Sequence, residues 1–183
     1  MKQEYGRYTK EHEEVWQILF ERQKENLADK ASPVFLECLE SFGETLVANH
    51  IPKFHEIDDT LLAKTGWSIE VVPGIIPVVE FFELLSRRKF CSSTWLRTKA
   101  QLDYLEEPDM FHDIFGHVPL LMHPRYADFM QEVGRIGYAC RADPKLLDAM
   151  ERLYWYSIEF GLVTSPDGHR IYGAGTLSSY GET

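Results

Sequence analysis

The chain has 183 residues, of which 44% are hydrophobic and 26% are charged, and its formal net charge at pH 7 is −10. This length and composition are typical of one globular domain with a sizeable core. The acidic balance argues against binding to nucleic acid or to an anionic membrane surface, since both attract clustered lysine and arginine.

Residues 1–66 predict a helical scaffold. Residues 9–28 have the apolar spacing of an amphipathic helix. Ser32 and Pro33 are the residue types of a helix N-cap and of the first helical position. The helix that follows is expected to bury one apolar stripe, which consists of Phe35, Leu39, Phe42 and Leu46.

A third, short helix is expected to be capped by Asp58 and to end at Gly66. Beyond it the pattern changes, and residues 67–183 are expected to carry the functional site. Strands are predicted over residues 67–72, 90–96 and 169–172, the last one after a turn at Asp167 and Gly168. Helices are predicted through Val79, Phe82 and Leu85, from about Pro108, over residues 126–136, and over residues 143–160 with a stop at Gly161. The fold class is therefore mainly α, in the α+β sense, with a few short strands.

The cysteines and the amino terminus indicate the compartment. Cys38, Cys91 and Cys140 are far apart, odd in number and outside any Cys-x-x-Cys motif, which favours a reducing environment. The first residues contain no apolar core of a signal peptide, and the longest apolar run, residues 71–82, is too short and too interrupted by proline to span a bilayer. We therefore expect a cytoplasmic protein.

Residues 107–119 contain His112 and His117, set five apart among apolar residues. Neutral histidine is the commonest metal ligand in proteins, so the two could share one ion. Five residues advance a regular helix by about 500°, however, which turns the two rings about 140° apart. The spacing alone leaves open a pair of ordinary core or surface histidines. A third ligand has to come from elsewhere in the chain.

Glu159 is our candidate for that third ligand. The end of the predicted helix 143–160 is apolar all round, as buried helices are. A carboxylate there is costly unless it is paired or bound to a metal, and the helix dipole also disfavours it in the last turn. On a helical wheel Glu159 points away from the stripe of Leu147, Met150 and Tyr154, so a solvated glutamate stays open as the alternative. Two imidazoles and one carboxylate, with no cysteine near the motif, are the ligand set of non-haem Fe(II) oxygenases.

Three motifs, in order, resemble those of the pterin-dependent aromatic amino acid hydroxylases. They are Pro-Asp-Met-Phe-His-Asp-Ile-Phe-Gly-His-Val-Pro at residues 108–119, the segment at 154–162 that contains Glu-Phe-Gly-Leu, and Ser-Ser-Tyr-Gly-Glu at 178–182. The resemblance extends from about Gly66 to the end of the chain and is nearest to bacterial members that act on phenylalanine. It implies the helical catalytic-domain fold of that family.

The resemblance also implies roles for individual residues. The iron ligands would be His112, His117 and Glu159. The tetrahydropterin would lie against Gly74, Ile76, Val78, Phe81, Asp113 and Tyr154. The amino acid would lie against Arg97, Pro108, Asp109, Trp155, Gly175 and Ser178, with Arg97 holding the carboxylate and Asp109 fixing Arg97. Apart from the resemblance, Phe81 and Trp155 could be ordinary core aromatics and Arg97 a surface arginine.

The implied activity is hydroxylation of L-phenylalanine to L-tyrosine with O2, Fe(II) and a tetrahydropterin. Alternatives are a tryptophan or tyrosine hydroxylase of the same family, a zinc-dependent hydrolase with Asp113 or Glu107 as general base, and a non-catalytic metal-binding domain. We expect residues 1–183 to form a single catalytic domain that ends early compared with the family, directly after the Ser-Ser-x-Gly-Glu motif. We also expect a monomer, because no regulatory or tetramerisation segment is visible.

Overall fold

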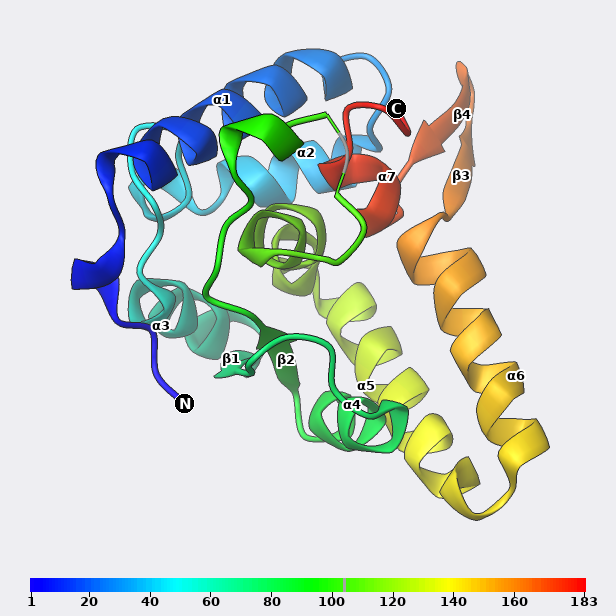
Figure 1. Ribbon diagram of the computed structural model, residues 1–183. Coiled ribbons are helices and arrows are strands. Elements are labelled where there is room, and N and C mark those ends of the chain that lie inside the picture. The colour runs from blue at the N-terminus through cyan, green and yellow to red at the C-terminus, as the bar shows by residue number, and fades with distance from the viewer. Residues whose placement is uncertain (104) are drawn as a thin grey trace.

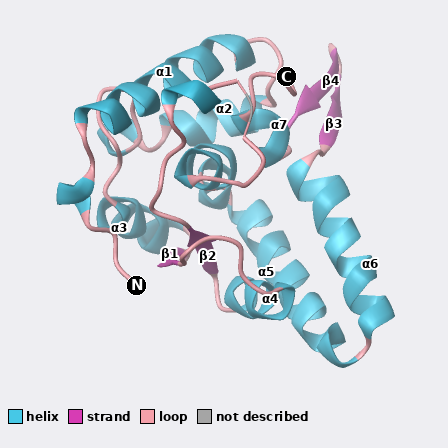
Figure 2. Cartoon of the chain, viewed as in Figure 1, coloured by secondary structure: helices cyan, strands magenta, loops and turns pink. Residues whose placement is uncertain are grey.

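The computed structural model describes residues 1–103 and 105–183. The chain is mainly helical, with two small sheets set among the helices (Figure 1, Figure 2). The helices are α1 (Lys10–Leu27), α2 (Pro33–Glu40), α3 (Phe54–Lys64), α4 (Val78–Ser86), α5 (Pro124–Ala139), α6 (Pro144–Tyr154) and α7 (Ala174–Ser178). The strands are β1 (Ser68–Val71), β2 (Lys89–Ser92), β3 (Leu162–Ser165) and β4 (Gly168–Ile171). These elements confirm the predicted fold class. None of the helices in the described ranges combines the length and the apolar character needed to cross a membrane.

Side-chain caps mark the starts of the first two helices, and the cap of the second is the one that the sequence predicts. Thr9 caps α1, and its Oγ1 accepts a hydrogen bond from the His12 amide at 3.4 Å. Ser32 caps α2, where its Oγ accepts from the Phe35 amide at 3.2 Å and Pro33 occupies the first helical position. Each cap satisfies a backbone N–H that no carbonyl of the same helix can reach.

The second helix is shorter than the predicted stripe. It ends at Glu40, so Phe42 and Leu46 lie beyond it. Gly43 has a φ of +53°, a left-handed conformation that glycine adopts readily and that a regular helix does not contain. Phe42 and Leu46 are nevertheless buried, because the loop folds both side chains back into the same core.

The predicted start of the third helix is wrong. α3 begins at Phe54 rather than at Asp58, because the side-chain oxygen of Gln3 accepts a hydrogen bond from the Phe54 amide at 2.9 Å. Asp58 lies inside the helix and accepts instead from the amide of Ile69, at 2.6 Å, which ties α3 to β1. The predicted stop is confirmed, since the helix ends just before Gly66, whose φ is +75°.

β1 and β2 are parallel neighbours, and α4 forms the crossover between them. Both strands lie where the sequence predicts strands, but β2 ends at Ser92 and not at residue 96. The amide of Ser93 donates to the carboxylate of Asp113 at 2.9 Å, so it does not continue the ladder. This contact fixes the end of β2 beside the histidine motif.

The second half of the chain adds the α5 and α6 pair, which lie side by side at one edge of the molecule (Figure 1). α5 extends the predicted helix at both ends. α6 begins at the predicted cap, where the Asp143 carboxylate accepts from the Lys145 amide at 2.9 Å. α4 packs closely on α5 at Gly137, where a side chain would not fit: a Cβ there would lie 2.4 Å from the Phe82 ring.

The chain then forms a hairpin of β3 and β4, with Gly168 at the predicted turn and a φ of +109°. β4 confirms the predicted third strand, whereas β3 and α7 were not predicted from the sequence. α7 contains five residues, which is too short for an apolar period to show in the sequence.

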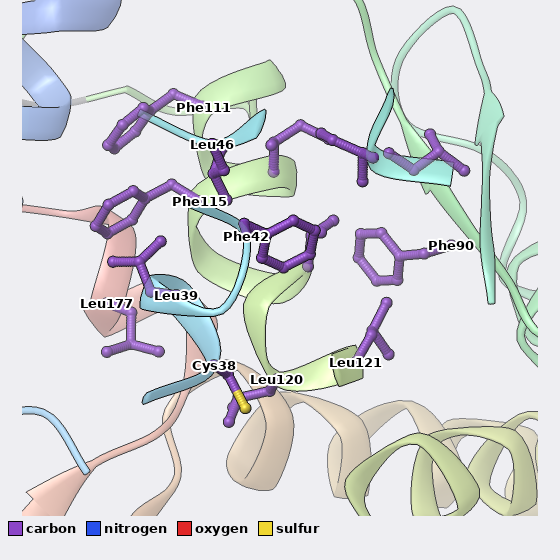
Figure 3. Packing of buried hydrophobic residues seen from close by; sticks show 14 of the residues in the cluster. Cys38, Leu39, Phe42, Leu46, Phe90, Phe111, Phe115, Leu120, Leu121 and Leu177 are labelled. Carbon is purple, nitrogen blue, oxygen red and sulfur yellow. The ribbon is translucent and has the colours of Figure 1, made fainter. Parts of the chain in front are cut away.

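The core joins the amino-terminal helices to the histidine motif. Phe111 and Phe115 stack on each other with ring centroids 4.9 Å apart. Trp16 packs edge-on against Phe111 at 5.4 Å, and Phe20 against Phe115 at 5.1 Å. Figure 3 shows Phe111 and Phe115 beside Leu39 and other buried side chains from several parts of the chain. The helical scaffold therefore holds the histidine-bearing segment directly.

Candidate metal centre and adjoining pockets

His112 and His117 lie at the two ends of a π-helical segment, His112–His117. A π-helix has hydrogen bonds from residue i to residue i+5, so residues five apart come close on one face. The Nε2 atoms of the two rings are 3.2 Å apart. The wider turn thus removes the divergence of about 140° that a regular α-helix would impose on this spacing.

Glu159 reaches the histidines from a second π-helical segment, Trp155–Glu159, which continues α6. Its Oε1 is 3.1 Å from Nε2 of His117, and its Oε2 is 3.6 Å from Nε2 of His112. The residue is 9% exposed. The alternative of a solvated glutamate therefore does not hold, and the structure brings the three candidate ligands together.

The expectation that the end of this helix is buried all round is wrong. Trp155 is 55% exposed, Tyr156 74% and Leu153 49%, whereas Ile158 and Glu159 are buried. The wider turn of the π-helical segment aims Ile158 and Glu159 at the core. Its aromatic neighbours lie along the surface and the rim of a pocket.

The separations of the three ligand atoms suit one metal ion. All three atoms lie within 4.8 Å of one another, and residues 1–103 and 105–183 hold no other such group of three His, Cys, Asp or Glu side chains. An ion ~2.1 Å from each atom requires ligand atoms about 3.0 Å apart in an octahedral arrangement and about 3.4 Å apart in a tetrahedral one. The 3.2 Å between the two Nε2 atoms and the 3.1 Å from Nε2 of His117 to Oε1 of Glu159 fit such an ion, and the other carboxylate oxygen, Oε2, lies 3.6 Å from Nε2 of His112.

Protonation states favour the same conclusion. Burial lowers the pKa of His112 to about 4, even though Glu159 opposes the shift, so the imidazole is neutral at pH 7. Burial by itself raises the pKa of Glu159, but the two histidines and the amide of Gly175 outweigh it and hold the pKa at about 2. A neutral imidazole and an ionised carboxylate are the forms that bind a metal.

Ser178 of α7 sets the orientation of the His112 ring. The Ser178 hydroxyl lies 2.8 Å from the carbonyl oxygen of Ala174, to which it donates, and 2.8 Å from Nδ1 of His112. A hydroxyl has one proton, so its oxygen must accept from a protonated Nδ1 of His112. That tautomer leaves the Nε2 lone pair directed at the other candidate ligands, as in metal sites where the second ring nitrogen is held by a neighbour. Nδ1 of His117 is buried and has no partner among the described residues.

Three glycines let the backbone of α7 come close to the ligands. A Cβ at Gly116, between the histidines, would lie 2.8 Å from the carbonyl oxygen of Ala174. A Cβ at Gly173 would lie 2.4 Å from the carbonyl oxygen of Glu159, and one at Gly175 would lie 3.3 Å from its Oε2. Since no side chain intervenes, the Gly175 amide reaches the Glu159 carboxylate and lowers its pKa.

One pocket lies on the β-strand side of the three ligands and contains most of the residues that we assign to the pterin. It is lined by Gly74, Ile76, Phe81, Asp113 and Tyr154 together with His112, His117 and Glu159. Val78 lies beside it, on an adjoining pocket that shares Ile76, Phe81, Tyr154 and Glu159. Sequence reasoning missed several lining residues, namely Val72, Ile75, Phe90, Cys91 and Ser93. Val72 and Ser93 directly follow β1 and β2, and Phe90 and Cys91 lie within β2, so strand position was the only signal that the sequence offered for them.

A second pocket lies on the α7 side. It is lined by five of the six residues that we assign to the amino acid, namely Arg97, Pro108, Trp155, Gly175 and Ser178, and by His112 and Glu159. The pocket is also lined by five residues to which the sequence assigned no role, although three of them belong to the matched motifs: Leu105, Glu106, Phe160, Ser179 and Glu182. His112 and Glu159 thus separate two pockets and face both of them.

Arg97 and the sixth residue, Asp109, form a buried ion pair at the base of this second pocket. Nε and Nη2 of Arg97 each donate to a different carboxylate oxygen of Asp109, both at 2.9 Å. Arg97 is 6% exposed and Asp109 is fully buried, so the alternative of a surface arginine is wrong. Asp109 also accepts from the amides of Arg97 and His112, which ties the ion pair to the first candidate ligand.

Comparison with known proteins places this architecture in a family. The family model for the biopterin-dependent aromatic amino acid hydroxylases matches residues 4–183. Phenylalanine-4-hydroxylase of Ralstonia nicotianae is 46% identical over 183 residues, which are 100% of this chain and 58% of that protein. The enzyme of the same name from Chromobacterium violaceum is 46% identical over 181 residues, covering 99% of this chain and 60% of the relative. The chain thus spans about three-fifths of the length of these relatives.

Solved structures agree in fold as well as in sequence. Phenylalanine hydroxylase of Chromobacterium violaceum with bound iron(III) and 7,8-dihydrobiopterin matches with a TM-score of 0.94 and 46% identity, over 100% of this chain and 65% of that one. The iron- and phenylalanine-bound structure of the same enzyme matches with a TM-score of 0.91 and 43% identity, also over 100% and 65%. The chain therefore belongs to the family of biopterin-dependent aromatic amino acid hydroxylases.

Proposed function

We propose that this chain forms the catalytic region of an iron- and tetrahydropterin-dependent monooxygenase that converts L-phenylalanine to L-tyrosine with O2. The observation that carries the proposal is the placing of His112, His117 and Glu159 between two pockets. The two Chromobacterium violaceum structures are described with iron and a dihydrobiopterin and with iron and phenylalanine, respectively. Bound iron and tetrahydropterin supply the oxidising chemistry, and the chain supplies position.

The three ligands favour iron over a structural zinc site. Two imidazoles and one carboxylate bind one face of the ion and leave its other positions open. No cysteine is close to the motif in the sequence, but Cys91 lines the first pocket. Burial raises the pKa of the Cys91 thiol to about 12, so it stays protonated and does not act as a thiolate ligand.

The first pocket suits a flat pterin ring. Phe81 lies edge-on to Tyr154, with ring centroids 4.9 Å apart, and both are at the pocket wall. Gly74 and Ile76 line the same pocket, and Val78 lines the pocket that adjoins it. Burial raises the pKa of Asp113 to about 7, although the amide of Ser93 opposes the shift. Near neutral pH the Asp113 carboxyl group can therefore donate or accept a hydrogen bond to a pterin nitrogen.

The second pocket suits a zwitterion with an apolar ring. Asp109 holds Nε and Nη2 of Arg97, and no group in residues 1–103 or 105–183 accepts from Nη1, so this nitrogen can donate to the carboxylate of an amino acid. Pro108 and Trp155 give the pocket its apolar wall, while Gly175 and Ser178 give it polar backbone and hydroxyl groups. His112 and Glu159 are common to both pockets, so an aromatic ring and a pterin can approach the same ion.

Turnover tests the proposal. The purified chain is loaded with Fe(II) without oxygen, and tetrahydrobiopterin, phenylalanine and air are then added. We expect tyrosine to form, with no product when iron, pterin or air is left out. Matched assays with tryptophan and with tyrosine as substrates test the two other specificities of the family. An iron-loaded chain that binds the pterin and phenylalanine but forms no tyrosine would contradict the proposal.

We further propose that the protein is a monomer in the cytoplasm. The formal net charge of −10 at pH 7 and the three cysteines outside any disulfide support this. Analytical ultracentrifugation over a range of concentrations should give one species of about 21.3 kDa for this chain. A mass that rises with concentration would count against the monomer.

A further inference from the structure

α7 is a short helix that contacts two of the three candidate metal ligands. Its Ser178 hydroxyl accepts from Nδ1 of His112, and its backbone at Gly175 packs against Glu159, where an added Cβ would lie 3.3 Å from Oε2. A helix of five residues is far below the length at which helices are stable in water without tertiary contacts. The position of α7, and with it that of two ligand partners, must therefore be set by its neighbours.

Gln23 of α1 contacts the carboxyl-terminal end of α7. Its Nε2 lies 3.4 Å from the carbonyl oxygen of Thr176, 3.3 Å from that of Ser179 and 3.0 Å from Oγ1 of Thr183. The last carbonyls of a helix have no donor within the helix and need one from outside. Gln23 is 2% exposed, and a buried amide is costly unless it is hydrogen-bonded. The Thr183 hydroxyl lies 2.9 Å from the carbonyl oxygen of Thr176 and 2.6 Å from that of Ser179, and it accepts from Gln23. The Gln23 carboxamide of α1 therefore caps α7 together with Thr183.

α1 also holds the segment on the other side of the Ser178–His112 contact. Its Trp16 and Phe20 pack against Phe111 and Phe115, which flank His112 in the histidine motif. The same rigid helix therefore contacts the histidine-bearing segment through aromatic rings and α7 through one amide. α1 therefore contacts both of the segments that meet at the Ser178–His112 hydrogen bond.

We propose that Gln23 is a positioning residue of the metal centre. Its amide holds α7 in the place where Ser178 orients the His112 ring and Gly175 packs against Glu159. The inference rests on the proposed metal-binding role of His112, His117 and Glu159. It adds a residue of the amino-terminal scaffold that touches none of the ligands.

The test compares Co²⁺ binding by Gln23→Met with binding by the unaltered chain. Methionine is unbranched, similar in length and a good helix former, but it donates no hydrogen bond. Gln17→Met is the matched control, because Gln17 lies on the exposed face of α1 and donates to Glu21 at 2.9 Å. We expect Gln23→Met to bind Co²⁺ about tenfold more weakly than the unaltered chain, because the loss of a hydrogen-bond partner of a metal ligand typically weakens metal binding by about this factor. We also expect the visible spectrum of bound Co²⁺ to change. Gln17→Met should match the unaltered chain in both.

A double variant separates positioning from a general effect on stability. Ser178→Ala should weaken Co²⁺ binding and change the spectrum in the same direction. If Gln23 acts through Ser178, the factor by which the double variant loses Co²⁺ affinity is smaller than the product of the factors measured for the two single variants. Losses that multiply would refute the inference. So would a Gln23→Met chain with a lower urea midpoint but an unaltered Co²⁺ affinity and spectrum.

Gln23→Glu is measured in parallel, because it keeps the shape of the side chain if the methionine variant fails to fold. Its carboxylate faces carbonyl oxygens instead of donating to them, so we expect weaker Co²⁺ binding here too. A folded Gln23→Glu chain with unaltered affinity would overturn the inference. Failure of the unaltered chain to bind Co²⁺ would instead refute the proposed metal site, and the role of Gln23 with it.

Discussion

Gly116 offers a sharp test of how closely α7 packs on the histidine segment. In Gly116→Ala, the new methyl group would lie 2.8 Å from the carbonyl oxygen of Ala174 and 3.3 Å from the Cβ of Ser178. Favourable contacts of this kind are about 3.5 Å or longer, so α7 has to move by roughly 0.5 Å or more. The hydrogen bond between Ser178 and His112, now 2.8 Å, would then pass the usual limit of about 3.2 Å.

Two effects on stability oppose each other in this variant. Overpacking costs about 1–3 kcal/mol, and replacing glycine by alanine within a helix returns up to about 1 kcal/mol. We therefore expect the free energy of unfolding of the metal-free chain to fall by only about 0–2 kcal/mol. Loss of the ligand's partner should weaken metal binding by about 10- to 100-fold, which corresponds to about 1.4–2.8 kcal/mol.

Urea denaturation of the metal-free chain and titration with Co²⁺ measure the two effects separately. Gly6→Ala is the control, because no atom of residues 1–103 or 105–183 lies within 4 Å of a Cβ built there. The control should bind Co²⁺ like the unaltered chain. If Gly116→Ala also bound Co²⁺ with unaltered affinity, the reasoning that α7 orients His112 would be refuted.

Three further variants test other parts of the site. Asp109→Asn leaves the buried Arg97 without its charged partner and should lower the free energy of unfolding, measured in urea, by about 3–5 kcal/mol. The control Asp148→Asn removes one partner of an exposed ion pair and should change the free energy of unfolding by less than about 1 kcal/mol. Equal effects of the two substitutions would argue against the buried pair. Because burial raises the pKa of Asp113 to about 7, its contribution to stability is full below about pH 4 and is lost as the pH rises through 7. Asp113→Asn should remove a decline on the order of 3 kcal/mol between about pH 4 and 8 in the metal-free chain, and an unchanged pH profile would show that the carboxyl group titrates normally. Phe81→Ala should weaken tetrahydrobiopterin binding about tenfold in calorimetry while iron binding is unaltered, and equal pterin affinity would remove Phe81 from the pterin site.

Local signals predicted much of the helical framework. The Ser32 and Asp143 caps, each followed by proline, mark helix starts that depend only on adjacent residues. Asp58 failed as a cap because its carboxylate is taken by the amide of Ile69, a contact that only the folded chain creates. α7 could not be predicted, since it is held by groups on α1 and by the histidine segment rather than by its own sequence.

The metal centre shows why spacing alone did not decide the site. The helical period of 3.6 residues separates His112 from His117 and turns Glu159 away from the buried stripe. Neither argument from the α-helical period applies to the two segments that carry the candidate ligands, because both segments form the wider turns of a π-helix. Such turns are rare and occur often at functional sites. The choice of Glu159 therefore came from the cost of a buried carboxylate and from family resemblance, not from periodicity.

Iron content after anaerobic loading tests most directly whether His112, His117 and Glu159 share one ion. The chain is incubated with Fe(II), desalted without oxygen, and analysed for iron beside the alanine variants of each ligand and of His169, which is exposed on β4. We predict close to one iron per chain for the unaltered protein and for His169→Ala, and almost none for His112→Ala, His117→Ala and Glu159→Ala. Full iron content in the Glu159→Ala chain would contradict the shared site.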